Sequence, residues 1–382
     1  MTPTSGHRLL IARTDLPDVR LGPDPDAPSA RPLQPGQARL QIEGFALTAN
    51  NITYAAFGDA MKYWQFFPSG DAGRGCLPVW GFATAVESQV DGVAPGRRIW
   101  GCFPAGTHLV VAPGKVSAHG FADAALHRLD LALVYRQYAF CDADPAWQPD
   151  LEGLQALLRP LFITAFLLDD FLADNDFFGA EQLLLSSASS KTAFATAACL
   201  AERRGATDAQ GRPPVPRIVG LTSAGNRAFA QSLGCYGEVR LYDELDAMPA
   251  ATRSVYVDFA GNASLRRAVH CHFGDALAYS SSIGGTHWDA LGSGRDLPGP
   301  RPVLFFAPAQ VKLRSAPPPE GWGGAELQQR IASAWTRFIG RVKRGGWVQV
   351  IERGGAQAAL QAYGEMLAGR SDAREGLMLD MR

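Results

Sequence analysis

The amino-acid sequence predicts an α/β protein, in which a doubly wound parallel sheet is inserted in a β-barrel-type domain formed by both chain ends. Three observations predict this fold. Between Gln37 and Pro113, short alternating stretches such as ARLQIEGFAL and VWGFATAVES are separated by turns that contain glycine, which is typical of a barrel. From about residue 181 to residue 308, apolar strands alternate with helices, which indicates a parallel sheet covered on both faces. Beyond residue 345, the chain returns to a strand and a helix that lead to the segment GLMLDM.

The elements expected along the chain place the domain boundaries. Residues 16–36 are rich in Pro, Asp and Gly, and we expect a surface loop there. The run LEGLQALLRPLFITAFLLDDFLADN repeats apolar residues every three or four positions, which predicts a pair of amphipathic helices. We therefore assign residues 1–155 to the first part of the barrel-type domain, 156–309 to the inserted Rossmann domain and 310–382 to the second part of the barrel-type domain.

Within the inserted domain, six strands are expected in chain order: EQLLLSS, RIVGLTS, EVRLY, SVYVDFAG, ALAYSSSIG and RPVLFFAP. Helices such as KTAFATAACLAERR and NASLRRAVHCHFG connect neighbouring strands, and such crossovers should be right-handed. A long helix is expected over 326–344, followed by the strand WVQVIERGG, the helix AQAALQAYGEMLAG and the segment GLMLDM.

The composition excludes several classes of protein. A formal net charge of −1 over 382 residues gives no bulk attraction to nucleic acid or to an anionic membrane. The six cysteines are scattered without a CxxC pair, so neither a disulfide framework nor a four-cysteine zinc site is predicted. No apolar run approaches the roughly 20 residues that span a bilayer, and no secretory signal is visible at the N-terminus. We therefore expect a cytoplasmic protein without a membrane or nucleic-acid partner.

The first turn of the inserted sheet is expected to bind the pyrophosphate of a dinucleotide. Small residues follow the first strand and open onto a helix, so the backbone can approach phosphates at the partly positive helix N-terminus. The glycine fingerprint GxGxxG is absent, and the alternative is a serine-rich turn that only caps the helix. The expected contacts are Ser187, Ala188, Ser189, Ser190, Lys191 and Thr192.

The second turn favours NADP over NAD. An acidic residue after the second strand would bind the ribose 2′-hydroxyl of NAD. Here the strand ends in hydroxyls, an amide and an arginine, which suit the 2′-phosphate of NADP. The candidates are Thr222, Ser223, Asn226 and Arg227, with an ordinary surface role for Arg227 as the alternative.

The fourth and fifth strands are expected to border the nicotinamide and its ribose. The fourth ends with Asp258 and Gly261, and the fifth with Ser281 and Gly284. Asp258 has a second interpretation, in which its carboxylate only caps the helix that follows.

Three segments carry a resemblance that extends over nearly the whole chain. GQARLQIEGFALTANNITYAAFG, GCLPVWGFATAVESQVDGVAPGRRIWGCFP and GGWVQVIERGGAQAALQAYGEMLAGR resemble the medium-chain dehydrogenase/reductase superfamily, in its zinc-free quinone oxidoreductase and enoyl reductase branch. More closely, SSASSKTA, GLTSAGN, VDFAGN, GGTHW and LRPLFITAFLLDDFL resemble an uncharacterised family related to that superfamily. The resemblance implies a GroES-like barrel domain and an NADP cofactor, and it says little about the substrate.

The zinc ligands of that superfamily are missing from this sequence. Its zinc-dependent members carry a cysteine in the first loop and a Gly-His-Glu segment after it. The corresponding places here read Asn50-Asn51-Ile52-Thr53 and Trp80-Gly81-Phe82-Ala83, so we predict no metal.

Without zinc, a proton donor must stabilise the charge that hydride transfer leaves on the substrate. Enoyl reductases of the superfamily place a tyrosine shortly after the loop asparagine, which implies Tyr63, or Tyr54, as donor and Asn51 as an orienting group. Thr164 is a candidate contact to the nicotinamide ribose. The aromatic residues between 54 and 67 form either the wall of an apolar pocket or a core.

The function predicted is the transfer of hydride from NADPH to an activated C=C or C=O of a small apolar substrate, without metal. The alternative is an NADP(H)-binding protein with little or no catalysis, such as a redox sensor or scaffold. A third hypothesis is a substrate carried on a protein or on coenzyme A and held by Arg74, Arg97, Arg98 and Lys115. RPVLFFAP is expected at the sheet edge, and an exposed apolar edge strand implies a homodimer.

Overall fold

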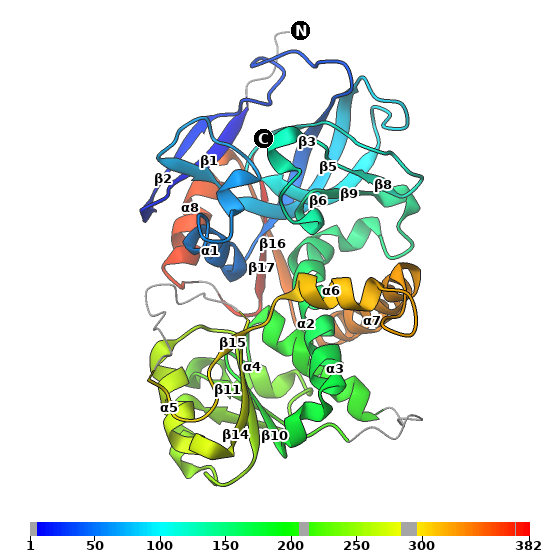
Figure 1. Cartoon of the computed structure of the whole chain (residues 1–382). Helices are drawn as coiled ribbons and strands as arrows, with labels where there is room; N and C mark the ends of the chain where they lie inside the picture. Colours follow the sequence, from blue (N-terminus) through cyan, green and yellow to red (C-terminus); the bar gives the residue numbers. More distant parts are fainter. Residues whose placement is uncertain (1–5, 206–213, 284–295, 371) are drawn as a thin grey trace. The chain divides into compact units, whose positions relative to one another are not determined.

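The computed structural model describes residues 6–205, 214–283, 296–370 and 372–382. The chain forms two compact units, of which unit 1 contains Met1–Leu157 and Gln349–Arg382, and unit 2 contains Leu158–Val348. Unit 1 thus combines both chain ends, and unit 2 is inserted between them, as the sequence predicted (Figure 1). The sequence placed the return to the first domain at residue 310, whereas the compact unit 2 continues to Val348.

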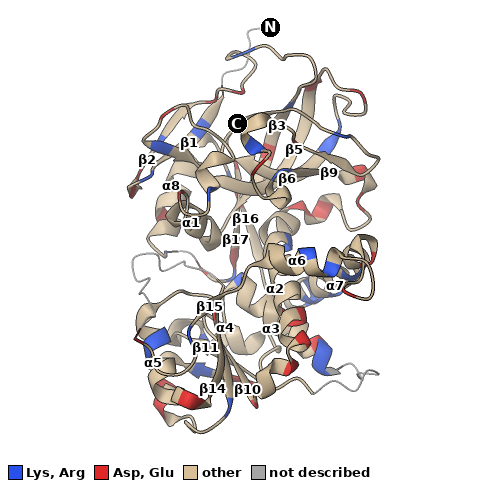
Figure 2. Ribbon diagram, viewed as in Figure 1, with Lys and Arg blue, Asp and Glu red and all other residues tan. Residues whose placement is uncertain are grey.

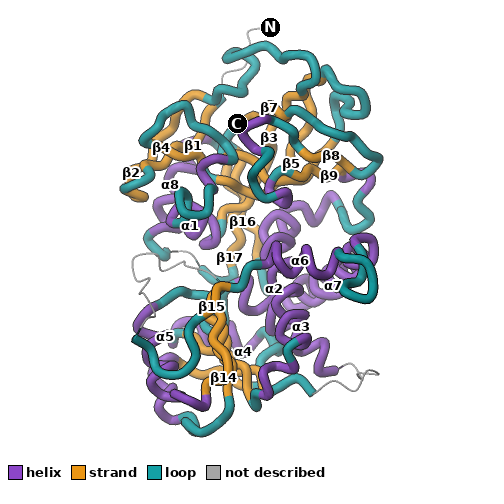
Figure 3. The backbone as a smooth tube through the Cα atoms, viewed as in Figure 1, coloured by secondary structure: helices purple, strands orange, loops and turns teal. Residues whose placement is uncertain are grey.

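Unit 1 consists mostly of strands and loops (Figure 3). A three-stranded sheet has the order β2-β1-β4, and an eight-stranded sheet has the order β16-β17-β3-β5-β6-β9-β8, with β7 paired to β3. The strands are β1 (His7–Ala12), β2 (Asp15–Pro23), β3 (Ala38–Leu47), β4 (Arg74–Cys76), β5 (Pro78–Ser88), β6 (Arg98–Pro104), β7 (His108–Val111), β8 (Gly120–Ala122), β9 (Gln137–Phe140), β16 (Gln349–Gly354) and β17 (Glu375–Asp380).

The last strand of the chain completes the sheet of unit 1. β17 pairs antiparallel with β3, opposite Phe45 at Leu379, and parallel with β16. Strands β3 and β5 approach so closely that a Cβ at Gly81 would lie 2.1 Å from the carbonyl oxygen of Gly44. This pairing explains why the two ends of the sequence fold together: the last residues of β3, next to β5 on one side, gain their partner on the other side from β17.

Two expectations about secondary structure were wrong. Residues 16–23, expected within the loop 16–36, belong to β2, which pairs antiparallel with β1. The segment 151–175 was expected to be two helices, but it contains one α-helix, α2 (Glu152–Asp174), with Pro160 inside. Its buried apolar positions continue on both sides of the proline, and tertiary packing therefore outweighs the local helix-breaking tendency. Helix α2 begins in the last residues of the first part of unit 1 and continues into unit 2, and the helices wholly within unit 1 are α1 (Ala49–Ala56) and α8 (Ala356–Leu367).

Unit 2 contains a six-stranded sheet with the order β12-β11-β10-β13-β14-β15. All neighbours are parallel, and the order is that of a doubly wound sheet whose first strand, β10, is central. Figure 1 draws α3 and α5 on opposite sides of this sheet. The strands are β10 (Gln182–Leu185), β11 (Arg217–Thr222), β12 (Glu238–Leu241), β13 (Ser254–Asp258), β14 (Leu277–Ser282) and β15 (Val303–Leu304).

The helices of unit 2 have apolar faces that match their positions. In α7, the buried residues Leu327, Ile331, Trp335 and Phe338 recur every three or four positions, which gives one face to pack and one for water. Gly346, with φ at 57°, ends this helix in the left-handed conformation that glycine adopts readily. The helices are α3 (Lys191–Gly205), α4 (Arg227–Ser232), α5 (Ala263–Phe273), α6 (Ala307–Ser315) and α7 (Gly324–Gly345). No helix in the described ranges is long and apolar enough to span a membrane.

Candidate functional site

The candidate cofactor residues of unit 2 follow the carboxyl ends of neighbouring parallel strands. The turn at Ser186–Ser190 follows β10, the turn that begins at Ser223 follows β11, and Asp258 ends β13. From β10, the sheet continues to β11 on one side and to β13 on the other, so this edge is a topological switch point. Ligands of doubly wound sheets bind at such points.

The turn after β10 has the tight geometry of a glycine turn without a glycine. Ser187 has φ at 52°, in the left-handed region that glycine usually occupies. The Ala188 amide donates to the carbonyl oxygen of Leu221 at 3.0 Å, and the Ser190 amide donates to that of Ser187 at 2.7 Å. Helix α3 begins directly afterwards at Lys191, where the Ser190 hydroxyl accepts from the amide of Ala193 at 3.4 Å.

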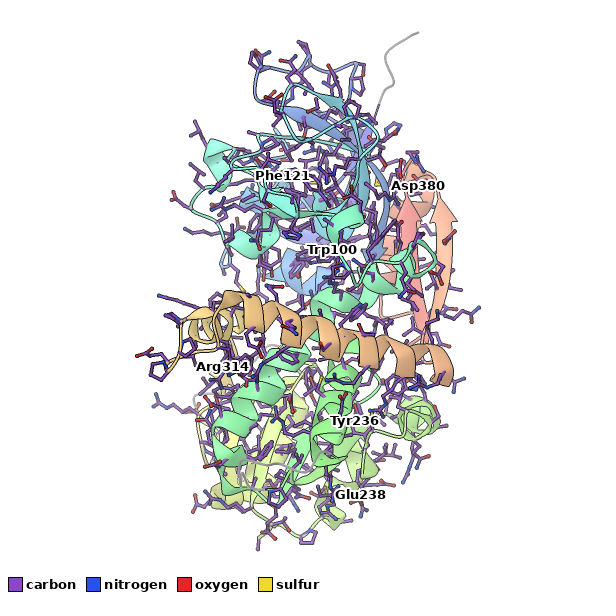
Figure 4. The ribbon with its side chains drawn as sticks, turned by 90° about the vertical axis from the view of Figure 1, so that its right-hand side faces the viewer. Trp100, Phe121, Tyr236, Glu238, Arg314 and Asp380 are labelled. Atoms are coloured by element: carbon purple, nitrogen blue, oxygen red, sulfur yellow. The ribbon has the colours of Figure 1, made fainter. Side chains whose placement is uncertain are left out.

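The packing beneath this turn also requires small residues. A Cβ at Gly220 would lie 2.8 Å from Cβ of Ala188 and 2.9 Å from Cδ1 of Tyr236. Tyr236, labelled in Figure 4, donates its hydroxyl to the carbonyl oxygen of Ala188 at 2.7 Å. The sequence analysis missed both residues, because a single glycine within a strand and a tyrosine in a loop carry no signal of their own.

The buried hydroxyl of Ser186 joins the turn to the end of β13. It donates to Oδ1 of Asp258 at 3.1 Å and accepts from the amide of Phe259 at 2.9 Å. Oδ1 of Asp258 also accepts from the amide of Gly261 at 2.9 Å, and Oδ2 accepts from Nε of Arg266 at 3.0 Å. Both carboxylate oxygens therefore have protein partners. This arrangement supports the second interpretation of Asp258, as the residue that shapes the turn, and the helix cap itself is Asn262.

The loop after β11 combines polar groups with one ion pair. Thr222 is buried. The side-chain Nδ2 of Asn226 donates to the hydroxyl of the exposed Ser223 at 3.3 Å. Nη1 of the partly exposed Arg227 lies 2.8 Å from Oε1 of Glu244. The backbone amide of Leu241 and the Arg227 guanidinium lower the pKa of Glu244, so this carboxylate is charged and pairs with Arg227.

The remaining cofactor candidates are placed as follows. Ser281 is fully buried, and its hydroxyl has no hydrogen-bond partner among the residues that the structure describes. Ser189 is buried, whereas Thr192 and Thr164 are half-buried on α3 and α2. Oγ1 of Thr164 donates to the carbonyl oxygen of Pro160 at 3.4 Å. Gly284 lies outside the described residues.

Tyr242 is a further residue of this region that the sequence analysis missed. Its phenol contacts Ser187, the turn residue with positive φ. Burial raises the pKa of Tyr242, and the contact with Ser187 lowers it by a smaller amount. The phenol thus stays protonated at neutral pH and is a hydrogen-bond donor beside the turn.

In unit 1, Asn51 is a structural residue of α1. Its Oδ1 accepts from the amide of Thr48 at 2.7 Å and from the Thr48 hydroxyl at 3.1 Å. Its Nδ2 donates to the carbonyl oxygen of Pro78 at 2.9 Å. The side-chain amide of Asn51 thus forms a capping box with Thr48 at the start of α1. It could contact a ligand only by breaking these hydrogen bonds. The expected orienting role of Asn51 stays an untested prediction.

Three tyrosines, rather than two, come together in unit 1. The rings of Tyr54 and Tyr63 lie 4.5 Å apart, and Tyr135 meets both edge-on, at 5.8 and 5.6 Å between centroids. The hydroxyls of Tyr63 and Tyr135 are 3.3 Å apart. We call these residues the tyrosine cluster.

Tryptophans border the tyrosine cluster. Trp80 lies 5.9 Å from Tyr135 and stacks on Trp100, labelled in Figure 4, at 4.9 Å. Of the other aromatic residues from 54 to 67, Trp64, Phe66 and Phe67 are at most 2% exposed and belong to the core. Tyr54 and Tyr63 belong to the same core, so the aromatic run from 54 to 67 is largely core, and its phenols meet Tyr135 within it.

The arginines of the third hypothesis are paired with acids. Arg74 contacts Asp18, Arg97 contacts Asp142, and Arg98 contacts Glu43 and Glu152. Basic and acidic residues are interspersed in unit 1 (Figure 2). These pairs support an ordinary solvated surface over an anion-binding patch.

Side chains of His, Cys, Asp and Glu in the described part of the chain do not gather in groups of three that could hold a metal ion. At the places of the superfamily's zinc ligands, Asn51 caps a helix and Gly81 meets the backbone of β3. The predicted independence from zinc stays a prediction.

The doubly wound parallel sheet inserted in a barrel-type unit of both chain ends is the architecture of the medium-chain dehydrogenase/reductase superfamily. The chain belongs to the family described as "Protein of unknown function (DUF2855)", whose model matches residues 45–372. This agrees with the resemblance to an uncharacterised family related to that superfamily. No protein of curated function matches the sequence.

Solved structures share the fold over the whole chain. CurA of Vibrio vulnificus, in complex with NADPH, has a TM-score of 0.60 at 11% identity, covering 98% of this chain and 99% of its own. A mutant enoyl thioester reductase of Candida tropicalis has a TM-score of 0.57 at 10% identity, covering 99% and 100%. The yhdH oxidoreductase of Salmonella enterica, in complex with NADP, has a TM-score of 0.51 at 10% identity, covering 98% and 100%.

Proposed function

We propose that this protein is an NADPH-dependent oxidoreductase that reduces an activated C=C or C=O of a small apolar substrate without a metal ion. The observation that carries the proposal is the turn at Ser186–Ser190, which lies at the switch point of the sheet and opens onto α3. The complexes of CurA with NADPH and of the yhdH oxidoreductase with NADP support the choice of cofactor.

The residues of unit 2 fit a dinucleotide. The Ser187 backbone adopts positive φ without a glycine, and Gly220 leaves the turn room to pack against β11. The buried Ser281 hydroxyl lacks a described partner, as expected for a group that a ligand completes. Arg227, Ser223 and Asn226 offer donors for the 2′-phosphate, and the first turn offers backbone amides for the pyrophosphate.

The chemistry assigned to unit 1 is proton donation. NADPH supplies a hydride when it is bound. Tyr63 then donates its phenolic proton to the oxygen or carbon that carries the resulting negative charge. Burial raises the pKa of Tyr63, so the donor is protonated over the neutral range. Lys62, next to it in the sequence, has φ at 62° and fixes the direction in which the chain enters the short turn at Tyr63–Gln65.

The proposal is tested by titrating the purified protein with NADPH and NADH, followed by turnover with a panel of enones and quinones. We expect micromolar binding of NADPH, weaker binding of NADH, and consumption of NADPH with a member of the panel. A preference for NADH would overturn the assignment of the Ser223–Arg227 loop, and binding of neither would overturn the assignment of the serine-rich turn.

A second candidate, a cofactor-binding protein with little catalysis, is favoured by the saturated hydrogen bonds of Asn51 and Asp258. Both side chains were expected to contact the substrate or cofactor, and both form hydrogen bonds with other groups of the protein instead. Tight binding of NADPH without turnover across the panel would select this function over the first.

We also propose that the protein is a homodimer that pairs along β15. This short strand ends the sheet of unit 2, and Val303, Leu304 and Phe306 are about half exposed there. Exposed apolar residues on an edge strand, which pairs with β14 on one side only, favour association with a second copy. Replacing Leu304 with Lys should shift the mass in light scattering from dimer to monomer, and a wild-type monomer would refute the proposal.

A further inference from the structure

Tyr135 belongs to the tyrosine cluster although it is distant in the sequence from the other two tyrosines. It lies 72 positions after Tyr63, yet the two hydroxyls are 3.3 Å apart. Its ring also meets Tyr54 edge-on, with the centroids 5.8 Å apart. The phenol of Tyr135 is thus in contact with both residues that the sequence offered as proton donors.

The local structure fixes how Tyr135 reaches the cluster. A single 3-10 turn, Leu133–Tyr135, follows Ala132, and the amide of Tyr135 donates to the carbonyl oxygen of Ala132 at 3.1 Å. Leu133 and Val134 point outward and are 48% and 41% exposed, whereas the ring of Tyr135 packs against the core of unit 1. This surface turn therefore directs the Tyr135 side chain into the tyrosine cluster.

The three phenols differ in their access to water. Tyr54 and Tyr63 are 6% and 8% exposed, whereas Tyr135 is half-buried. The hydroxyl of Tyr135 is nevertheless enclosed within the cluster, and more fully than that of Tyr63. The hydroxyl of Tyr63 is therefore the more accessible of the two to a substrate and to water.

The contact between the two phenols favours the charged form of Tyr63. Burial raises the pKa of Tyr63, and the hydrogen bond from Tyr135 lowers it by a smaller amount. Burial also raises the pKa of Tyr135, and its contacts with Tyr54 and Tyr63 raise it further. A tyrosinate formed at position 63 is thus stabilised by a protonated Tyr135, which donates to it.

We propose that Tyr135 is the positioning residue for Tyr63, and that it stabilises the Tyr63 tyrosinate by donating a hydrogen bond to it. This inference rests on the proposed function, because it assigns a role within the same reaction. Hydride from NADPH adds to the substrate, and the phenolic O–H bond of Tyr63 breaks as its proton passes to the reduced substrate. Tyr135 keeps its own proton and donates its hydrogen bond to the Tyr63 oxygen, which then takes up a proton from water. The net consumption is one hydride and one proton from water.

The first test compares Tyr135→Phe with wild type in the reduction of the best enone or quinone of the panel. The ring and its packing remain, and only the hydroxyl is lost. We expect kcat to fall about 10- to 100-fold with little change in KM, and its pH profile and solvent deuterium isotope effect to change, because proton transfer becomes slower. The matched control is Tyr363→Phe, which removes a hydroxyl that donates to the carbonyl oxygen of Leu16 at 3.1 Å, outside the cluster.

The second test needs no turnover and so separates this inference from the proposed function. Tyrosines carrying 13C at Cζ report ionisation by NMR, and Tyr63→Phe assigns the resonance of Tyr63. Loss of the Tyr135 hydroxyl should raise the pKa of Tyr63, because the donor to its tyrosinate is gone. The control Tyr363→Phe should leave this titration unchanged.

The outcomes are distinct. A raised Tyr63 titration together with the kinetic changes supports the positioning role of Tyr135. Unchanged titration, or unchanged kcat and pH profile in Tyr135→Phe with an active wild type, overturns it. If the wild-type protein consumes no NADPH with any substrate, the proposed function fails and the positioning role fails with it, even where the NMR titration reports the hydroxyl contact.

Discussion

Hydroxyl groups occupy both the serine-rich turn of unit 2 and the tyrosine cluster of unit 1, but their partners differ. In the turn, the Ser186 hydroxyl lies between Asp258 and the amide of Phe259, so it is held by groups of fixed position. In the cluster, the Tyr63 hydroxyl meets another hydroxyl, that of Tyr135. A hydroxyl between a carboxylate and an amide has one stable arrangement, whereas two hydroxyls can exchange the roles of donor and acceptor.

The difference teaches how similar groups serve structure in one place and chemistry in another. Asp258 and Arg266 form a buried ion pair that defines the shape of the turn. The cluster has aromatic neighbours such as Trp80 and Phe66, and burial there keeps the phenols protonated. We therefore expect substitutions in the turn to affect folding and cofactor binding, and substitutions in the cluster to affect turnover.

The largest expected effect is on the catalysed rate, after a substitution in the tyrosine cluster. Tyr63→Phe should lower the catalysed rate about 10²- to 10⁴-fold, because the proton donor is lost, and should leave the affinity for NADPH unchanged. Steady-state kinetics and cofactor titration measure the two effects, with Tyr363→Phe as the control. Unaltered turnover would remove Tyr63 from the mechanism.

The next largest effect is on the stability of unit 2, after a substitution beside the serine-rich turn. Asp258→Ala should destabilise unit 2 by about 3–5 kcal/mol, because the buried Arg266 loses its ion pair with Asp258, and Ser186 and Gly261 lose their acceptor. Urea denaturation measures the change. Asp258→Asn, which keeps an acceptor oxygen, should lose less. Wild-type stability in the alanine variant would show that the ion pair does not define the turn.

A smaller effect is expected on the affinity for NADPH relative to that for NADH. Arg227→Ala should weaken NADPH about tenfold and leave NADH unchanged, because a charge-assisted contact of about 1.5 kcal/mol is lost. Glu244→Gln should strengthen NADPH binding, because it releases the arginine from its ion pair. Arg267, an exposed arginine on α5, gives the matched control Arg267→Ala. Equal losses for both cofactors would contradict the assignment.

The smallest effect concerns the residue that stands where a glycine is usual. Ser187→Gly should change stability by no more than about 1 kcal/mol, and in the favourable direction, because glycine relieves the strain of positive φ. Thermal unfolding and NADPH titration check the outcome. Clear destabilisation would mean that the contact of the Ser187 hydroxyl with Tyr242 matters more than the backbone strain.

The sequence by itself determined the doubly wound sheet and its insertion between the chain ends. These follow from local periodicity, because strand–helix alternation such as QLLL followed by KTAFATAACLAERR is encoded by neighbouring residues. It also found the serine-rich turn without the glycine fingerprint, because the turn directly follows an apolar strand. The single helix across Pro160 was missed, because its continuation depends on packing.

Only the tertiary structure decided which polar groups are occupied and which side chains meet. Asn51 looked available in the sequence, yet Thr48 and Pro78 take up its amide. Tyr135 looked unremarkable, yet its hydroxyl reaches Tyr63. The physical reason is that hydrogen-bond saturation and contacts between residues 72 positions apart depend on how strands from distant parts of the chain pair, and local sequence does not specify such pairing.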